Sequence, residues 1–156
     1  MPPMDRRPSP GFTLVEILLA IAIVAVLMFV AAPSYSSYVE RTRVNQATID
    51  ILAIGAQIKA YELDNRDIPD DLSQIGAAGK LDPWGRPYVY LAFRTPADKG
   101  KARKDKNLVP INSEFDLYSV GKDGDSSPPL LAKQSRDDVV RANDGAFVGL
   151  ASDYTQ

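Results

Sequence analysis

Carboxylates gather in the last quarter of the chain, where they could bind a hard cation. The cluster consists of Asp123, Asp125, Asp137, Asp138 and Asp144. Carboxylate and backbone carbonyl oxygens are the ligands that Ca²⁺ prefers, and it takes roughly six to eight of them. The same residues could instead form a solvated acidic loop at the protein surface. The cluster alone therefore leaves a calcium site and a solvated loop as alternatives.

The EF-hand, the commonest calcium-binding loop, does not fit this cluster. If Asp123 and Asp125 held its first and third positions, Pro128 would stand where the loop needs a glycine for its sharp turn. Gln134 would stand at the last position, where the loop needs a bidentate glutamate. A calcium site in this segment must therefore use another geometry.

A second group that could do chemistry is the carboxylate of Glu16, which stands near the start of a long apolar run. It is the only charged residue between Arg7 and Glu40, and it follows Gly11-Phe12-Thr13 closely. A carboxylate in a membrane span costs roughly 2.5–3.5 kcal/mol on insertion scales. A chain that keeps this carboxylate is expected to use it. The alternative is a plain signal anchor in which Gly-Phe-Thr is accidental.

The side chains that most enzymes use are missing. The chain contains no histidine and no cysteine, which removes the commonest catalytic base and transition-metal ligand. It also lacks nucleophile motifs, phosphate-binding glycine loops and nucleotide fingerprints. Paired acids could serve a glycosidase, but so small a chain shows no sign of a cleft. The sequence therefore predicts a protein that is not an enzyme.

Basic residues form another charged cluster, upstream of the acidic one. It contains Lys99, Lys101, Arg103, Lys104 and Lys106, interrupted by Asp98 and Asp105. No aromatic residue lies among them, whereas nucleic-acid sites usually combine basic and aromatic side chains. The pattern predicts a solvated loop from Thr95 to Asn107 and no binding of nucleic acid.

The element that must position Glu16 is a membrane-spanning helix. The apolar run from Phe12 to about Ala32 has roughly 20 residues, which as a helix matches a hydrocarbon core about 30 Å thick. Met1 to Ser9 carry no apolar run, unlike a secretory signal peptide, and their arginines favour the cytoplasmic side. The expected organisation is a leader at residues 1–11, a span at 12–33 and a soluble part at 34–156.

Beyond Pro33 the pattern becomes amphipathic and predicts that the helix continues to about Leu63. Pro33 itself is expected to kink or locally melt the helix, because it removes a backbone hydrogen bond. Apolar residues then repeat at spacings of three and four, as on one face of a helix. They are Val44, Ala47, Ile51, Ile54, Ile58 and Tyr61. We expect this stripe to pack on a sheet as ordinary core.

Residues 88–93 and 115–120 are rich in aromatic and β-branched side chains and predict strands. The expected fold is α+β: a long N-terminal helix, transmembrane in one half and amphipathic in the other, packed on a small antiparallel β-sheet. An irregular C-terminal loop is expected to follow. Small domains often need a disulfide as a staple, but this chain has no cysteine. Another interaction must therefore hold the C-terminal segment.

The motif from Gly11 to Glu16, followed by the apolar run, resembles that of the type IV pilin superfamily, which comprises type IV pilins and the pseudopilins of type II secretion. Three further motifs are similar to the major pseudopilin: an Asp-Asn before a proline, an Asp-Pro-Trp-Gly turn, and a strand ending in Gly-x-Asp-Gly. They lie at Asp64-Asn65 with Pro69, at Asp82 to Gly85, and at Gly121 to Gly124. The chain departs from that family in a longer charged loop before Phe115, a longer segment from Ser126 to Gln134, and no tryptophan near Asn143.

The resemblance implies how the chain is processed and assembled. A prepilin peptidase would cut between Gly11 and Phe12, and Phe12 would then be N-methylated. Glu16, now the fifth residue, would pair with the amine of Phe12 on a neighbouring subunit during assembly. In the family, a stretch of helix at the position of Pro33 melts within the assembled filament.

The resemblance also implies a function. The chain would be a structural subunit of a type II secretion pseudopilus, waiting in the inner membrane as a single-pass protein with its soluble domain in the periplasm. It would polymerise with other pseudopilins at an inner-membrane assembly platform and drive the export of folded proteins across the outer membrane. The alternative is the major pilin of a type IV pilus, used in adhesion, motility or DNA uptake. A minor pseudopilin is a third possibility.

For the acidic cluster, the resemblance implies a structural Ca²⁺ in the C-terminal loop. One carboxylate would come from the Gly-x-Asp-Gly turn and two from the adjacent pair of aspartates. The implied ligands are the side chains of Asp123, Asp137 and Asp138 and the carbonyl oxygens of Val120 and Ser135.

Overall fold

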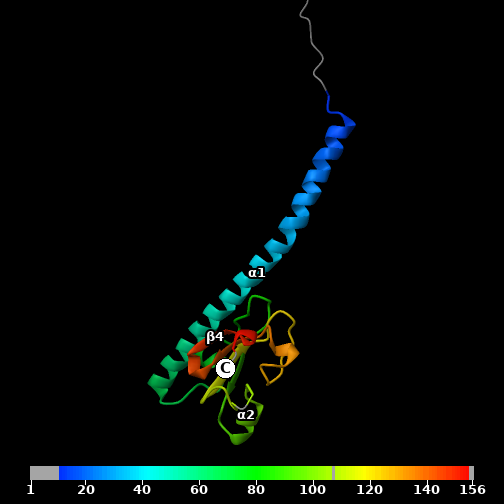
Figure 1. Ribbon diagram of the computed structural model, residues 1–156. Coiled ribbons are helices and arrows are strands. Elements are labelled where there is room, and N and C mark those ends of the chain that lie inside the picture. The colour runs from blue at the N-terminus through cyan, green and yellow to red at the C-terminus, as the bar shows by residue number, and fades with distance from the viewer. Residues whose placement is uncertain (1–10, 107, 155–156) are drawn as a thin grey trace, which may run out of the picture. The chain divides into compact units, whose positions relative to one another are not determined.

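The computed structural model describes residues 11–106 and 108–154, so the predicted leader lies outside the described residues except for Gly11. The chain divides into two compact units, Met1–Val39 and Glu40–Gln156. Helix α1, Leu14–Asn65, belongs to both units (Figure 1). Its 52 residues confirm the predicted long helix, and they continue through Pro33.

The first unit leaves its apolar side chains uncovered. Every residue from 11 to 38 is exposed, and Phe29 leaves 84% of its surface free. Within the described residues, α1 is the one helix that is long and apolar enough to cross a membrane, and none of its most apolar stretch is buried. The core helix of a soluble protein would be mostly buried instead. This half of α1 therefore needs lipid or other chains to cover it.

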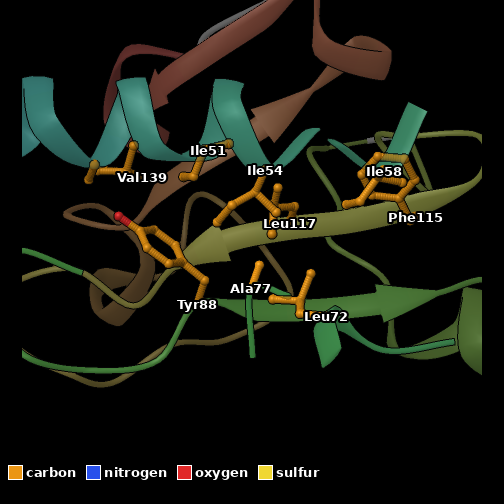
Figure 2. Packing of buried hydrophobic residues seen from close by; sticks show 10 residues of the cluster. Ile51, Ile54, Ile58, Leu72, Ala77, Tyr88, Phe115, Leu117 and Val139 are labelled. Atoms are coloured by element: carbon orange, nitrogen blue, oxygen red, sulfur yellow. The ribbon is translucent and has the colours of Figure 1, made fainter. Parts of the chain in front are cut away.

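The second half of α1 buries the predicted apolar stripe except at its two ends, Val44 and Tyr61, which are partly exposed. Ala47, Ile51, Ile54 and Ile58 are buried, and Val44 packs against them while partly exposed. Figure 2 shows the isoleucines pointing from the helix onto Phe115 and Leu117 of the sheet, with Leu72, Ala77 and Tyr88 along the edge of the same cluster. The stripe is ordinary core, as the periodicity predicts.

An acidic residue shares this buried face of α1. Asp50 is 8% exposed, and its carboxylate accepts a hydrogen bond from the hydroxyl of Tyr88 at 2.9 Å. The ammonium of Lys80 lies 2.8 Å from the other oxygen, which Gln46 also contacts at 3.1 Å. Burial raises the pKa of the Asp50 carboxyl, but the hydrogen bonds from Lys80, Tyr88 and Gln46 outweigh burial and hold the pKa below its ordinary value.

Four antiparallel strands form one sheet in the order β1-β2-β3-β4. They are β1 Val89–Ala92, β2 Phe115–Ser119, β3 Val139–Ala142 and β4 Phe147–Leu150. The first two confirm the predicted strands. The hairpin of β3 and β4 completes the small antiparallel sheet, because regular structure resumes at Val139 after the irregular segment that follows β2. The turn between them contains Asn143-Asp144-Gly145, residues that tolerate a left-handed backbone.

A second layer covers the face of the sheet away from α1. Alternation along β2 directs Leu117 into the helix-facing core and Tyr118 toward the second one. The buried residues of this second core are Ile111, Leu130, Val140, Ala142, Ala151 and Tyr154. They come from both long connections, from β3 and from the segment after β4. The two long connections, before β2 and before β3, therefore build a layer of the fold.

The basic segment is not the solvated loop that its charges predict. Its first part forms the short helix α2, Pro96–Lys101, which begins with a capping box between Thr95 and Asp98. Directly after it, Arg103 is 3% exposed and Asp105 is 5% exposed. The prediction fails because burial of Arg103 depends on a partner far along the chain, which local charge density cannot reveal.

Candidate functional site

Gly11 and Phe12, between which the predicted cleavage falls, precede the first turn of α1. Both are exposed, Phe12 to 83%. The helix begins with a reciprocal pair of hydrogen bonds: the backbone nitrogen of Glu16 donates to Oγ1 of Thr13, and the backbone nitrogen of Thr13 donates to Oε2 of Glu16, both at 3.2 Å. This is a capping box, which satisfies donors that a helix start leaves unpaired. The predicted cleavage bond is therefore accessible in this unit.

Glu16 consequently has a role within its own chain that the sequence interpretation missed. The pattern Thr-x-x-Glu before an apolar run is a capping-box signature, and it is visible at Thr13 to Glu16. A negative charge at a helix start also interacts favourably with the helix dipole. Part of the cost of placing this carboxylate beside a membrane is thus offset before any neighbouring subunit arrives.

The Asp-Pro-Trp-Gly turn ties the helix to the end of β2. The buried carboxylate of Asp82 accepts hydrogen bonds from the backbone nitrogens of Trp84 at 3.0 Å and Arg86 at 2.9 Å, and from the hydroxyl of Ser119 at 2.5 Å. The indole nitrogen of Trp84 donates to Glu40 on α1 at 3.2 Å. A turn that is similar to a family motif is therefore a structural junction between three segments.

The Gly-x-Asp-Gly turn is packed too tightly for side chains at its glycines. Gly121 has φ of 65°, and a Cβ there would lie 2.2 Å from the carbonyl oxygen of Asp137. Gly124 has φ of 79°, and a Cβ there would lie 2.5 Å from the guanidinium of Arg86. That guanidinium also donates to the carbonyl of Gly121 at 2.7 Å. The turn therefore packs closely against both Arg86 and Asp137. This packing places the end of β2 beside Asp137, one of the predicted calcium ligands.

The structure brings some of the predicted calcium ligands together. The backbone nitrogen of Asp123 donates to Oδ2 of Asp137 at 2.9 Å, which joins the turn to the aspartate pair. Ser135 is buried, its hydroxyl bonds the backbone of Ser127, and its carbonyl accepts from the nitrogen of Asp138 at 3.3 Å.

The two remaining acids of the cluster make different contacts from each other. Asp125 donates its backbone nitrogen to the side chain of Asp123 at 2.9 Å. Asp144 lies in the β3–β4 turn, where it accepts from the nitrogen of Ser113 at 2.8 Å and sits 3.9 Å from Arg141. Asp144 therefore belongs to a different part of the fold from the aspartate pair.

Asp138 is held by a cation from the basic segment. Its Oδ2 lies 2.5 Å from Nη2 of Arg103 and accepts from the hydroxyl of Ser126 at 2.6 Å. The side chains of Arg103 and Asp138 are 3% and 0% exposed. Burial raises the pKa of the Asp138 carboxyl to about 6, an effect that Ser126 and Arg103 offset only in part. Arg103 is the residue of this region that sequence reasoning missed.

The predicted calcium donor set is not assembled in this arrangement. Across residues 11–106 and 108–154, no group of three acidic side chains is placed so that it could hold a metal ion. Asp138, one of the three implied carboxylate ligands, faces Arg103, and Asp137 accepts from the backbone of Asp123. The residues as placed therefore do not fit Ca²⁺, and the calcium site stays a prediction.

Comparison with known proteins gives the same family as the motifs. The prokaryotic N-terminal methylation motif matches residues 6–32. The type II secretion system core protein G of Pseudomonas aeruginosa is 33% identical over an alignment of 142 residues, and the match covers 78% of this chain and 89% of that protein. The core protein G of Dickeya chrysanthemi is 31% identical over 126 residues, covering 78% of this chain and 82% of that protein.

A type IV major pilin protein and other fimbrial proteins match as well. A fimbrial protein of Neisseria meningitidis serogroup A is 33% identical over 147 residues, which cover 94% of this chain and 86% of that protein. No solved structure gives a significant match to the chain. This chain has the methylation motif at the start of a long apolar helix, and the second half of that helix packs on a small antiparallel sheet. The chain therefore belongs to the type IV pilin superfamily, together with the core protein G of type II secretion systems.

Proposed function

We propose that the chain is a structural subunit of a type II secretion pseudopilus. The observation that carries this proposal is the first half of α1, whose apolar side chains are exposed from residue 11 to residue 38. Such a surface is stable in lipid before assembly and against the same helix of other subunits after it. The second unit, by contrast, has its own cores and can remain folded through the transfer from membrane to filament.

Processing and partners follow from this proposal. A prepilin peptidase cuts between Gly11 and Phe12 on the cytoplasmic side, and the mature subunit is anchored once in the inner membrane with its sheet domain in the periplasm. An inner-membrane assembly platform then adds it to a polymer with other pseudopilins. The growing filament drives folded proteins across the outer membrane, and the subunit contributes surfaces for polymerisation and performs no catalysis.

Deletion of the gene in the source bacterium tests the proposal. We expect secreted enzymes to accumulate in the periplasm, and we expect reintroduction of the wild-type gene to restore their export. Intact-mass measurement of the protein from membranes should show loss of Met1 to Gly11 and gain of one methyl group. A mature N-terminus at another residue would contradict membership of a processed filament.

The match to a fimbrial protein over 94% of the chain supports one alternative, the major pilin of a type IV pilus. The two functions predict different phenotypes for the same deletion. Loss of surface pili, with normal export of folded proteins, would favour the type IV pilus. Retention of exoproteins in the periplasm, with surface pili intact, would favour the pseudopilus.

A further inference from the structure

The C-terminal segment is held by a buried cation that belongs to the chain itself. Arg103 is 3% exposed and Asp138 is fully buried. Nη2 of Arg103 lies 2.5 Å from Oδ2 of Asp138, a residue 35 positions away in the sequence. A hydrogen bond between two charged groups is shorter and stronger than one between neutral groups. This contact therefore ties the basic segment to the start of β3.

The same guanidinium reaches three more groups. Its Nη1 donates to the hydroxyl of Ser126 at 2.5 Å and to the carbonyl of Ser127 at 2.8 Å. Its carbon lies 4.4 Å from the centre of the Tyr118 ring, within the range of a cation–π interaction. One cation thus joins β2, the start of β3 and the long connection between these strands. A structural metal ion joins separate segments of a loop in the same way.

The backbones that carry these contacts are also paired. The nitrogen of Lys104 donates to the carbonyl of Pro128 at 2.9 Å, and the nitrogen of Leu130 donates to the carbonyl of Lys104 at 2.9 Å. These residues belong to the two long connections of the sheet, the one before β2 and the one before β3. They meet each other over the second core, and Arg103 lies where they meet.

A calcium ion would compete with this arrangement. Among the described residues, Oδ1 of Asp138 has no hydrogen-bond partner, so this oxygen could accept another ligand. A divalent ion bound there would lie beside the guanidinium that holds Oδ2. Two cations repel each other strongly where burial keeps water away. The guanidinium of Arg103 therefore explains why the calcium ligands that the resemblance implies do not form a calcium site in the structure.

We propose that Arg103 takes the place of a calcium ion as the cation that holds the C-terminal loop of this chain. The guanidinium neutralises Asp138 and cross-links the segments around it. The pairing of the two long connections places Arg103 beside Asp138. The folded domain consequently does not depend on calcium. This inference does not depend on whether the filament is a pseudopilus or a pilus.

Thermal unfolding of the full mature chain in detergent micelles tests this inference. Near-UV circular dichroism, to which Trp84 and the tyrosines contribute, would be followed in millimolar calcium and in chelator. We expect the two Tm values of the wild type to agree within about 2 °C. A structural ion at a hundredfold excess over its Kd would raise the Tm of a domain of this size by roughly 10 °C. A calcium-dependent rise of that size in the wild type would overturn the inference.

Two glutamine variants distinguish the effect of the buried Arg103 cation on the Tm from the effect of removing any positive charge from this segment. Arg103→Gln leaves a buried carboxylate unpaired and should lower the Tm in chelator by roughly 10 °C or more. Calcium should then restore part of the loss, because Asp138 is free to bind it. Lys101→Gln removes an exposed positive charge from the same segment and should change the Tm by less than about 2 °C. Equal Tm values for the two variants would overturn the inference.

Hydrogen exchange of the wild type keeps the test decisive if Arg103→Gln does not fold. Amides from residue 126 to residue 138 should be protected to the same extent in calcium and in chelator. Protection of this segment that appears only in calcium would show that a metal ion, and not Arg103, holds the loop.

Discussion

The two units of this chain differ in what covers their apolar side chains. In the first unit, every described residue up to 38 is exposed, and the apolar surface of α1 has no cover within the chain. In the second unit, one core lies between α1 and the sheet and another lies beyond the sheet, and the buried carboxylates of Asp50 and Asp138 are each paired with a cation. Variants in the first unit should therefore affect processing and assembly, whereas variants in the second should affect stability.

The largest expected effect comes from the residue before the predicted cleavage bond. Gly11→Trp should block processing completely, because a bulky side chain would occupy the position next to the bond that the peptidase cuts. The membrane should then contain only full-length precursor, and no filament should form. Mass spectrometry and immunoblotting of membrane fractions would measure this. Unfolding of the sheet domain should be unchanged, and processing of Gly11→Trp at the wild-type rate would contradict the cleavage site.

Two variants of Glu16 sharpen the comparison at the helix start. Glu16→Gln keeps an acceptor for the nitrogen of Thr13 but removes the charge, whereas Glu16→Val removes both. If the carboxylate pairs with the amine of Phe12 on a neighbouring subunit, both variants should lose filaments, because an amine left without its partner charge is costly in an apolar core.

The capping role predicts a different result from those variants. If capping of α1 were the main role of Glu16, Glu16→Gln should assemble almost normally and Glu16→Val should not. We expect the first result, with both variants inserted in the membrane and few filaments in sheared fractions. Wild-type filament yield for Glu16→Gln would eliminate the charge pairing.

Two isoleucines of the same helix give a direct contrast in stability. Ile54 is 1% exposed and Ile23 is 53% exposed. Ile54→Ala should lower the free energy of unfolding by about 2–5 kcal/mol, through lost burial and the cavity that remains. Ile23→Ala should leave unfolding of the sheet domain unchanged, since its side chain contacts no core. Urea unfolding in micelles would measure both, and similar losses for the two variants would contradict the division of α1.

These contrasts also show which features a sequence can reveal. The motif from Gly11 to Glu16, the length of α1 and its apolar stripe depend on neighbours within a few residues, so local patterns predicted them. β3 and β4 were not located because each has only four residues, and β4 also contains Gly149, which weakens a strand pattern.

The candidate site was less predictable because its contacts are long-range. The acids were visible as a cluster, but nothing local shows that Asp138 faces a guanidinium from another connection or that Asp144 lies in the β3–β4 turn. The charges around Arg103 even suggested the opposite, a solvated segment. A pattern shows which residues are charged, and only the fold shows which of them share a buried volume.

A buried acid on α1 gives the next effect, which depends on pH. Asp50→Asn should destabilise the fold by about 1–3 kcal/mol at neutral pH, because Lys80 loses its ionic partner and Tyr88 keeps only a neutral acceptor. The pKa of Asp50 in the folded state lies below its ordinary value. Its charge therefore stabilises the fold above the unfolded pKa of about 3.9, and this contribution is lost as the pH falls through the folded pKa.

Acid unfolding of the wild type and of Asp50→Asn would measure that difference. The variant should lose less stability than the wild type as the pH falls below about 4, because it has no carboxylate to protonate at this position. Parallel stability curves over this range would show that another acid controls acid unfolding of the domain.

The smallest effect is expected where an ion pair of the second unit is exposed to water. The ammonium of Lys59 lies 2.8 Å from Glu62 on the same helix and also contacts Glu114, the residue before β2. Its side chain is 43% exposed, whereas that of Arg103 is 3% exposed. Lys59→Met keeps most of the aliphatic stem and should cost less than about 1 kcal/mol, because water and salt screen such pairs. Raising the salt concentration should reduce even this loss in urea unfolding. A loss above about 2 kcal/mol would mean that exposed and buried ion pairs contribute alike to this domain, and burial would then no longer explain why Arg103 can hold its C-terminal loop.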